Sequence, residues 1–106
     1  METWILMADE QEASLVVRSL YGPCYRIETW KRRGEAAQIF AEQVAAGVSA
    51  LRSHFDALVV AAGPNLLEPL SRALPSSLVV RKVSRYLTHL SSRELSQELA
   101  VLTGGD

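Results

Sequence analysis

The sequence has very little of the chemistry that disulfides, zinc sites and thiol enzymes need. Only one cysteine, Cys24, and two histidines, His54 and His89, occur among its 106 residues. A single cysteine forms no internal disulfide, and one sulfur with two distant imidazoles does not make a four-ligand zinc set. Cys24 lies in a segment of strand character, where a thiol is typically a small apolar filler. We therefore expect a reducing compartment, no metal and no other cofactor.

The sequence also lacks a long apolar run and an excess of charge of either sign. Its first apolar run, residues 4–8, is too short for a signal-peptide core or a membrane span, and no basic leader precedes it. The 11 basic and 12 acidic residues give a formal net charge of -1. No overall field therefore attracts the chain to nucleic acid or anionic lipid. We predict a cytoplasmic protein without a membrane partner, in which any nucleic-acid contact depends on a local patch.

What is present is the composition of one folded domain. The chain is 48% hydrophobic and 22% charged, which differs from the low hydrophobicity and high charge of disordered proteins. Its length fits a single core. We predict one α/β domain over residues 1–103, followed by a frayed tail over residues 104–106.

Three strands are predicted in the first third of the chain. Residues 4–8 form a continuous apolar run, typical of a strand buried on both faces, so we place it at the centre of a sheet. Residues 13–21 are rich in β-formers, and residues 24–30 alternate between apolar and charged side chains. The turn dipeptide Gly22-Pro23 separates these two segments and predicts a hairpin.

Helical and strand patterns then alternate. The longest helix is predicted over residues 34–55, where four apolar residues share one stripe: Phe40, Val44, Val48 and Leu51. Residues 57–62 are a second buried-strand run, and the strand, helix, strand order implies a parallel crossover. A short helix is predicted over residues 65–74, with Asn65 and Glu68 spaced as a capping box.

The last third of the chain predicts an edge strand and a final helix. Residues 78–83 read as a strand that is more polar and therefore nearer a sheet edge. The final helix begins at Ser91 or Ser92, because Ser91 and Glu94 have capping-box spacing. Its apolar stripe consists of Leu95, Leu99 and Leu102.

The predicted fold class is α/β: a mixed five-stranded sheet, with three antiparallel strands and then a parallel β-α-β unit, packed with helices. Ribonuclease-H-like domains share this topology, and their nucleases hold two metal ions with acidic residues. Asp9 with Glu35 or Glu42 can supply two carboxylates, but Gly-Pro-Asn follows the strand at residues 57–62, where a third acid is needed. Solvation of a turn by Asp9 and of a helix face by Glu42 therefore fits better than a nuclease.

Motifs of other enzyme classes are absent from the sequence. No serine lies in a Gly-x-Ser-x-Gly elbow, and no Walker or dinucleotide-binding glycine pattern occurs. The two histidines are isolated from any candidate nucleophile. We therefore expect no catalytic residue, no small-molecule substrate and a protein that works by binding.

Two basic segments are candidates for contact surfaces. Lys31, Arg32, Arg33, Gly34 and Glu35 form the most concentrated one, at the predicted start of the long helix, where a phosphate can bind. The alternative interpretation is a solvated connection. The second segment, which runs from Arg81 and Lys82 to Arg85 and Tyr86, is either edge protection or a contact surface.

Several short motifs resemble one family. They are Trp-Ile-Leu-Met-Ala-Asp at residues 4–9, Phe-Asp-x-Leu-Val-Val-x-Ala at 55–62, Leu-x-x-x-Leu-Ser-x-Ala-Leu at 66–74, and Leu-Thr-His-Leu-Ser at 87–91 running into Glu94-Leu95. Together they resemble the bacterial proteins required for attachment to host cells, a family related to the middle domain of class-one peptide release factors. The resemblance implies the same α/β fold and a role in translation.

The resemblance departs at the loop that carries function. Release factors promote peptidyl-tRNA hydrolysis with a Gly-Gly-Gln loop before a long helix, and the matching place here is Arg33-Gly34-Glu35. Only Gly34 keeps its type, because a glutamate replaces the glutamine and an arginine replaces the first glycine. We therefore expect a non-catalytic release-factor-like module that binds RNA or ribosomes through residues 31–35. The alternative is a protein interaction or homodimerisation domain linked to host attachment.

Overall fold

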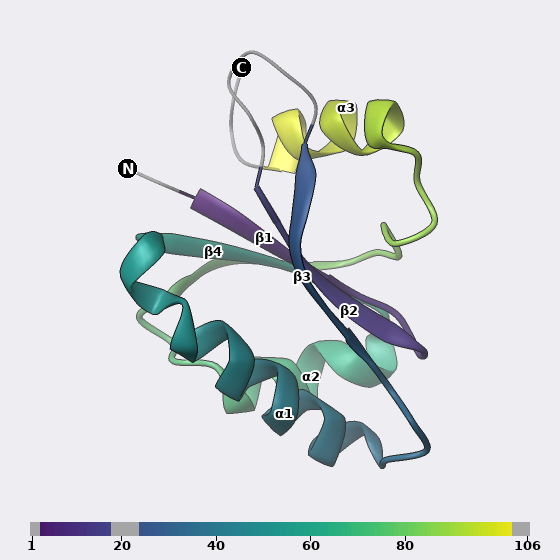
Figure 1. The fold of residues 1–106 in the computed structure, drawn as a ribbon, viewed down its shortest axis with the longest axis vertical. Coiled ribbons are helices and arrows are strands. Elements are labelled where there is room, and N and C mark those ends of the chain that lie inside the picture. The colour runs from purple at the N-terminus through teal and green to yellow at the C-terminus, as the bar shows by residue number, and fades with distance from the viewer. Residues whose placement is uncertain (1–2, 18–23, 103–106) are drawn as a thin grey trace.

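The computed structural model describes residues 3–17 and 24–102, with the side chains of Tyr25, Ser92 and residues 99–102 excepted. The chain forms a mixed five-stranded sheet with three α-helices, as predicted (Figure 1). Several predicted features lie outside the described residues. They are the turn at Gly22-Pro23, the end of the strand that precedes this turn, the tail at residues 104–106, and the side chains of Leu99 and Leu102.

The elements follow the predicted order. They are β1 (Thr3–Ala8), β2 (Glu12–Val17), β3 (Tyr25–Lys31), α1 (Ala37–Ala50), the short 3-10 helix η1 (Arg52–His54), β4 (Ala57–Ala62), α2 (Pro64–Ala73), β5 (Val79–Ser84) and α3 (Ser92–Leu102). Among the described residues, no helix combines the length and apolar character needed to cross a bilayer.

Strand β1 lies at the centre of the sheet, whose order is β3-β2-β1-β4-β5. It pairs antiparallel with β2 and parallel with β4, and β2 pairs antiparallel with β3, while β4 pairs parallel with β5. Four of the five strands therefore run in the same direction, and β2 alone is reversed. The ends of β1, β3, β4 and β5 consequently meet at one end of the sheet, which we call the carboxyl end.

The continuous apolar runs of β1 and β4 supply both faces of the sheet, because successive side chains point to opposite sides. Leu6 and Val60 belong to the cluster under α1 and α2, whereas Ile5 and Val59 belong to the cluster under α3. Figure 1 shows α1 and α2 together on one face and α3 on the other. The sheet is thus the middle layer of three.

Helix α1 confirms most of the predicted stripe. Phe40, Val44 and Val48 are buried in the cluster that α1 shares with the sheet. The helix begins at Ala37 rather than at residue 34, because Gly34 has a φ of +90° that no right-handed helix can include. It ends at Ala50, before the separate η1 turn.

One predicted capping box is present and the other is wrong. At α3, Ser91 Oγ accepts a hydrogen bond from the Glu94 N–H at 3.2 Å, and the Glu94 carboxylate accepts one from the Ser91 N–H at 3.2 Å. At α2, the helix begins at Pro64 without a side-chain cap. Proline at the first helical position starts the helix one residue before the predicted one, and the Asn65 amide donates to Glu10 instead.

Both outer strands carry an irregularity. Opposite β2, the register passes from Arg26 to Glu28 and leaves Ile27 without a partner. Opposite β4, it passes from Val79 to Arg81 and leaves Val80 unpartnered. Bulges of this kind discourage pairing between sheet edges. The prediction that β5 is a polar edge strand is therefore confirmed, with a bulge that its sequence pattern does not reveal.

Candidate functional site

The carboxyl end of the sheet gathers polar segments that are distant in sequence. Asp9 and Glu10 follow β1, residues 32–35 follow β3, residues 63–65 follow β4 and residues 85–88 follow β5. In α/β sheets, this end is where ligands commonly bind. It is accordingly the first place to look for a functional site.

Glu10 is the hub of this end. Its carboxylate accepts hydrogen bonds from the Tyr86 hydroxyl at 3.3 Å and the Asn65 amide at 3.2 Å. It also forms an ion pair with Arg32 at 3.5 Å between Nη1 and Oε2. One carboxylate thus connects the ends of β1, β3, β4 and β5, and its oxygens are already engaged within the protein.

Asp9 is a turn residue. One carboxylate oxygen accepts the N–H groups of Gln11 at 2.7 Å and Glu12 at 2.9 Å, and the other accepts the Thr88 hydroxyl. Partial burial raises the pKa of Asp9, but these hydrogen bonds outweigh it and hold the pKa below its ordinary value. The described residues contain no group of three or more potential metal ligands. This arrangement supports the interpretation of Asp9 as part of a turn.

Arg32 fixes the loop at residues 31–35 to the β1–β2 turn. Its backbone N–H donates to the Gln11 carbonyl at 2.8 Å, and its Nη1 donates to the Glu10 carbonyl at 3.4 Å. Its Nε donates to the Glu35 carbonyl at 2.7 Å, which closes the loop on itself. Arg32 is therefore a structural cation that is already neutralised.

The other two cations of the loop, Lys31 and Arg33, are exposed, unlike Arg32. No side-chain hydrogen bond or ion pair of theirs is seen in the part of the chain that the structure describes, although the charge of Arg33 helps to lower the pKa of Glu35. Gly34 takes the positive φ that lets the loop reverse before α1. The loop thus presents two exposed cations on a backbone that Arg32 holds in place.

Glu35 folds back on its own loop. Its carboxylate accepts the N–H of Arg33. Hydrogen bonds from its own backbone N–H and from that of Arg33 hold the pKa of Glu35 below its ordinary value. A hollow of about 350 Å³ lies beside the loop, lined by Glu10, Gln11, Arg32, Gly34 and Glu35. Its charged groups are already paired, which disfavours a free anion-binding pocket there.

Two aromatic residues pack on glycines around this end. A Cβ at Gly63 would lie 2.3 Å from the Tyr86 ring, and a Cβ at Gly47 would lie 2.5 Å from the Trp30 ring. Trp30 thereby joins the end of β3 to α1, and Tyr86 joins the segment after β5 to the end of β4. Burial, and then the charge of Glu10, raise the pKa of Tyr86. Glycine is required at both positions because the ring occupies the space of a side chain.

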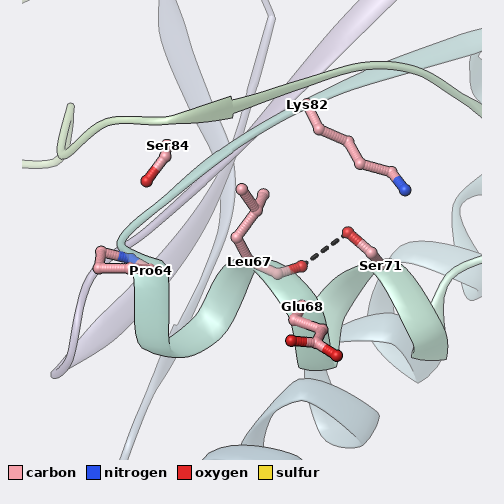
Figure 2. A pocket seen from close by; sticks show the side chains of 6 residues that line it. All are labelled: Pro64, Leu67, Glu68, Ser71, Lys82 and Ser84. Atoms are coloured by element: carbon pink, nitrogen blue, oxygen red, sulfur yellow. Dashed lines mark hydrogen bonds between the residues drawn. The ribbon is translucent and has the colours of Figure 1, made fainter.

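The five predicted site residues, 31–35, are consecutive in the sequence but have different roles in the structure. Sequence reasoning missed Glu10 as a hub, together with Asn65 and Tyr86. The sequence contains a signal that could have identified these three residues, because each follows a strand (β1, β4 or β5) and these strands run in the same direction. A second hollow, between α2 and β5, was also missed (Figure 2).

Comparison with known proteins adds no relative: no protein-family model matches the chain, and no curated protein matches it.

Proposed function

We propose that this protein is a non-catalytic binding module that contacts structured RNA, such as that of the ribosome, through the loop at residues 31–35. The observation that carries the proposal is the pair of exposed cations, Lys31 and Arg33, on a loop that Arg32 fixes to the β1–β2 turn. A fixed loop loses little conformational entropy on binding, and each cation that meets a phosphate releases a counterion.

The position of the loop also supports a release-factor-like role without release chemistry. It follows β3 and precedes the 14-residue helix α1, whose first turn has no side-chain cap. Where a release factor has glutamine, this chain has Glu35, whose carboxylate binds the Arg33 N–H. A carboxylate that is bound to its own loop in this way is not free to act on a substrate.

The test is co-sedimentation with ribosomes and binding to a structured RNA over a series of salt concentrations. We expect affinity to fall steeply with salt. Changing Lys31→Gln and Arg33→Gln together removes two phosphate contacts, so the slope of log K against log salt should fall by about 1.5.

The control changes Arg52→Gln and Arg93→Gln together, because both are exposed cations outside the loop. This pair removes the same charge and should leave the slope nearly unchanged. Equal losses in both double variants would show non-specific attraction and contradict the proposal. A salt-insensitive dimer without RNA association would favour the alternative of self-association.

A further inference from the structure

The outer side of β5 forms a groove with α2. The groove has a volume of about 400 Å³ and is lined by Pro64, Leu67, Glu68, Ser71, Lys82 and Ser84. Figure 2 shows Leu67 and Ser71 rising from α2 toward β5, with the Lys82 side chain extending above Ser71. An apolar side chain, hydroxyls and a cation therefore line one strip of the surface.

The strand beside this groove has an open edge. Among the described strands, β5 pairs only with β4, and after the bulge at Val80 its residues 81–84 stay in regular register with residues 59–62. An edge strand turns every second N–H and C=O away from its neighbour. Val80 is 62% exposed, and Arg81 and Lys82 are exposed as well. Four residues of regular backbone are thus available to pair with another strand.

The groove has a distinct polarity. Lys82 has no hydrogen-bond or ion-pair partner among the described residues. Glu68, the groove's acid, is already held by Arg72 at 2.8 Å. The Ser71 hydroxyl donates to the Leu67 carbonyl at 2.7 Å, so its oxygen remains free to accept. The unsatisfied charge in the groove is therefore positive.

This polarity disfavours a second copy of the chain as the occupant. A two-fold axis perpendicular to the sheet would pair two β5 strands antiparallel and keep each sheet face on the same side. Because paired residues point to the same face, one residue must then lie directly opposite its own copy, and the pairing is centred on that residue. Centred on Arg81 or Lys82, it places that cation opposite its own copy. Centred on Val83, it places Arg81 opposite Arg85, where the ion pair of Arg85 with Glu98 leaves a weaker repulsion. Like charges directly opposite destabilise a strand pair.

We propose that β5 and α2 form a docking groove for an extended acidic peptide of another protein, which adds a strand beside residues 81–84. The peptide backbone would pair with the free edge of β5. An acidic side chain would face Lys82, and an apolar side chain two residues away, on the same face of the peptide, would lie over Leu67. This site is separate from the RNA-binding loop.

The test is titration of the whole protein with an eight-residue peptide in which glutamate and valine occupy alternate same-face positions, separated by threonine. We expect the backbone amide NMR signals of residues 80–84 and 67–71 to shift. Lys82→Glu should weaken binding about fivefold, in the range for an exposed charge pair, while the same peptide with lysine in place of glutamate should prefer this variant. Arg52→Glu is the matched control and should leave the affinity unchanged.

Two further probes separate strand pairing from simple charge attraction. Methylating alternate peptide nitrogens removes the donors that a β-pair needs, and should abolish the shifts. Equal binding of the methylated peptide, or signal changes away from β5 and α2, would overturn the proposal. An RNA oligonucleotide that displaces the peptide from the groove would also overturn it, by assigning the β5 cations to nucleic acid. If Lys82→Glu does not fold, Lys82→Gln serves in its place.

Discussion

The two faces of the sheet are covered in different ways. Helices α1 and α2 bury Phe40, Val44 and Leu70 against the first face. Helix α2 connects the neighbouring parallel strands β4 and β5, whereas α1 connects β3 to β4 across β2 and β1. On the second face, the large apolar side chains that the C-terminal segment buries among the described residues are Leu87 and Leu95. Among the described residues, the helices on the first face therefore bury more large apolar side chains than the C-terminal segment buries on the second.

Polar contacts compensate on the second face. Ser96 Oγ accepts the Cys24 N–H at 3.2 Å, and Arg26 donates to the Thr88 carbonyl at 3.2 Å. Arg85 and Glu98 form an ion pair at 2.6 Å. Partly exposed contacts of this kind each contribute little. We therefore expect α3 to open locally before the rest of the domain unfolds.

The largest expected effect comes from matched core truncations on the two faces. Leu70→Ala should lower the free energy of unfolding by about 3–5 kcal/mol, because the cavity is enclosed by α1, α2 and the sheet. Leu95→Ala should cost about 2 kcal/mol, because α3 can shift to close part of the space. Leu70 and Leu95 are 1% and 3% exposed, so burial alone does not explain the difference.

Denaturant unfolding measures the cost of Leu70→Ala, and the opening free energy of α3 from hydrogen exchange measures that of Leu95→Ala, because α3 should open before the domain unfolds. Hydrogen exchange should show that Leu95→Ala accelerates the amides of α3 well beyond those of α1, while Leu70→Ala accelerates both. Equal losses of stability in the two variants, with equal exchange profiles, would show that the two faces form one cooperative unit.

A smaller effect is expected where the C-terminal segment crosses the carboxyl end. Thr88→Val removes the hydroxyl that donates to Asp9. Because that bond lowers the pKa of Asp9, the variant's Asp9 should titrate at higher pH, and stability at neutral pH should fall by about 1 kcal/mol.

The sign follows from linkage. A carboxyl whose folded pKa is depressed stabilises the fold above its unfolded pKa and loses that contribution as the pH falls through the folded value. The difference between Thr88→Val and the wild type should therefore be largest at neutral pH and shrink in acid. Thr29→Val, which breaks a 3.1 Å contact with the Ser14 hydroxyl, is the control: its cost should be independent of pH in this window. Carboxyl NMR titration checks the Asp9 pKa directly.

Much of the fold could be predicted because hydrophobic periodicity carries it. The apolar runs at residues 4–8 and 57–62 have strand length, and the stripe containing Phe40, Val44 and Val48 has helical period. The start of α2 could not be predicted in the same way. Asn65 and Glu68 have capping spacing, but Pro64 begins the helix earlier, and the Asn65 side chain is drawn to Glu10 by a tertiary contact.

The candidate site shows the same division. The sequence locates the basic loop, since three adjacent cations are visible locally. It does not reveal that Arg32 is bound by Glu10 and by the Glu35 carbonyl while Lys31 and Arg33 stay exposed, because this depends on two loops meeting at the carboxyl end. The groove beside Lys82 likewise cannot be predicted from the sequence, since its lining residues come from two separate elements, α2 and β5.

The smallest expected effect tests how independently the second face is covered. Ser91→Ala removes the α3 cap, leaving the Glu94 N–H without its side-chain acceptor, and should cost about 1 kcal/mol. If α3 opens locally, the cost should appear mainly as faster hydrogen exchange within α3, while the denaturant midpoint of the domain moves little. Gln97→Ala, an exposed change in the same helix, should alter neither. A Ser91→Ala variant that lowers protection equally in α1 and α3 would mean that the cap stabilises the whole domain, so that α3 belongs to one cooperative core despite its smaller set of buried apolar contacts.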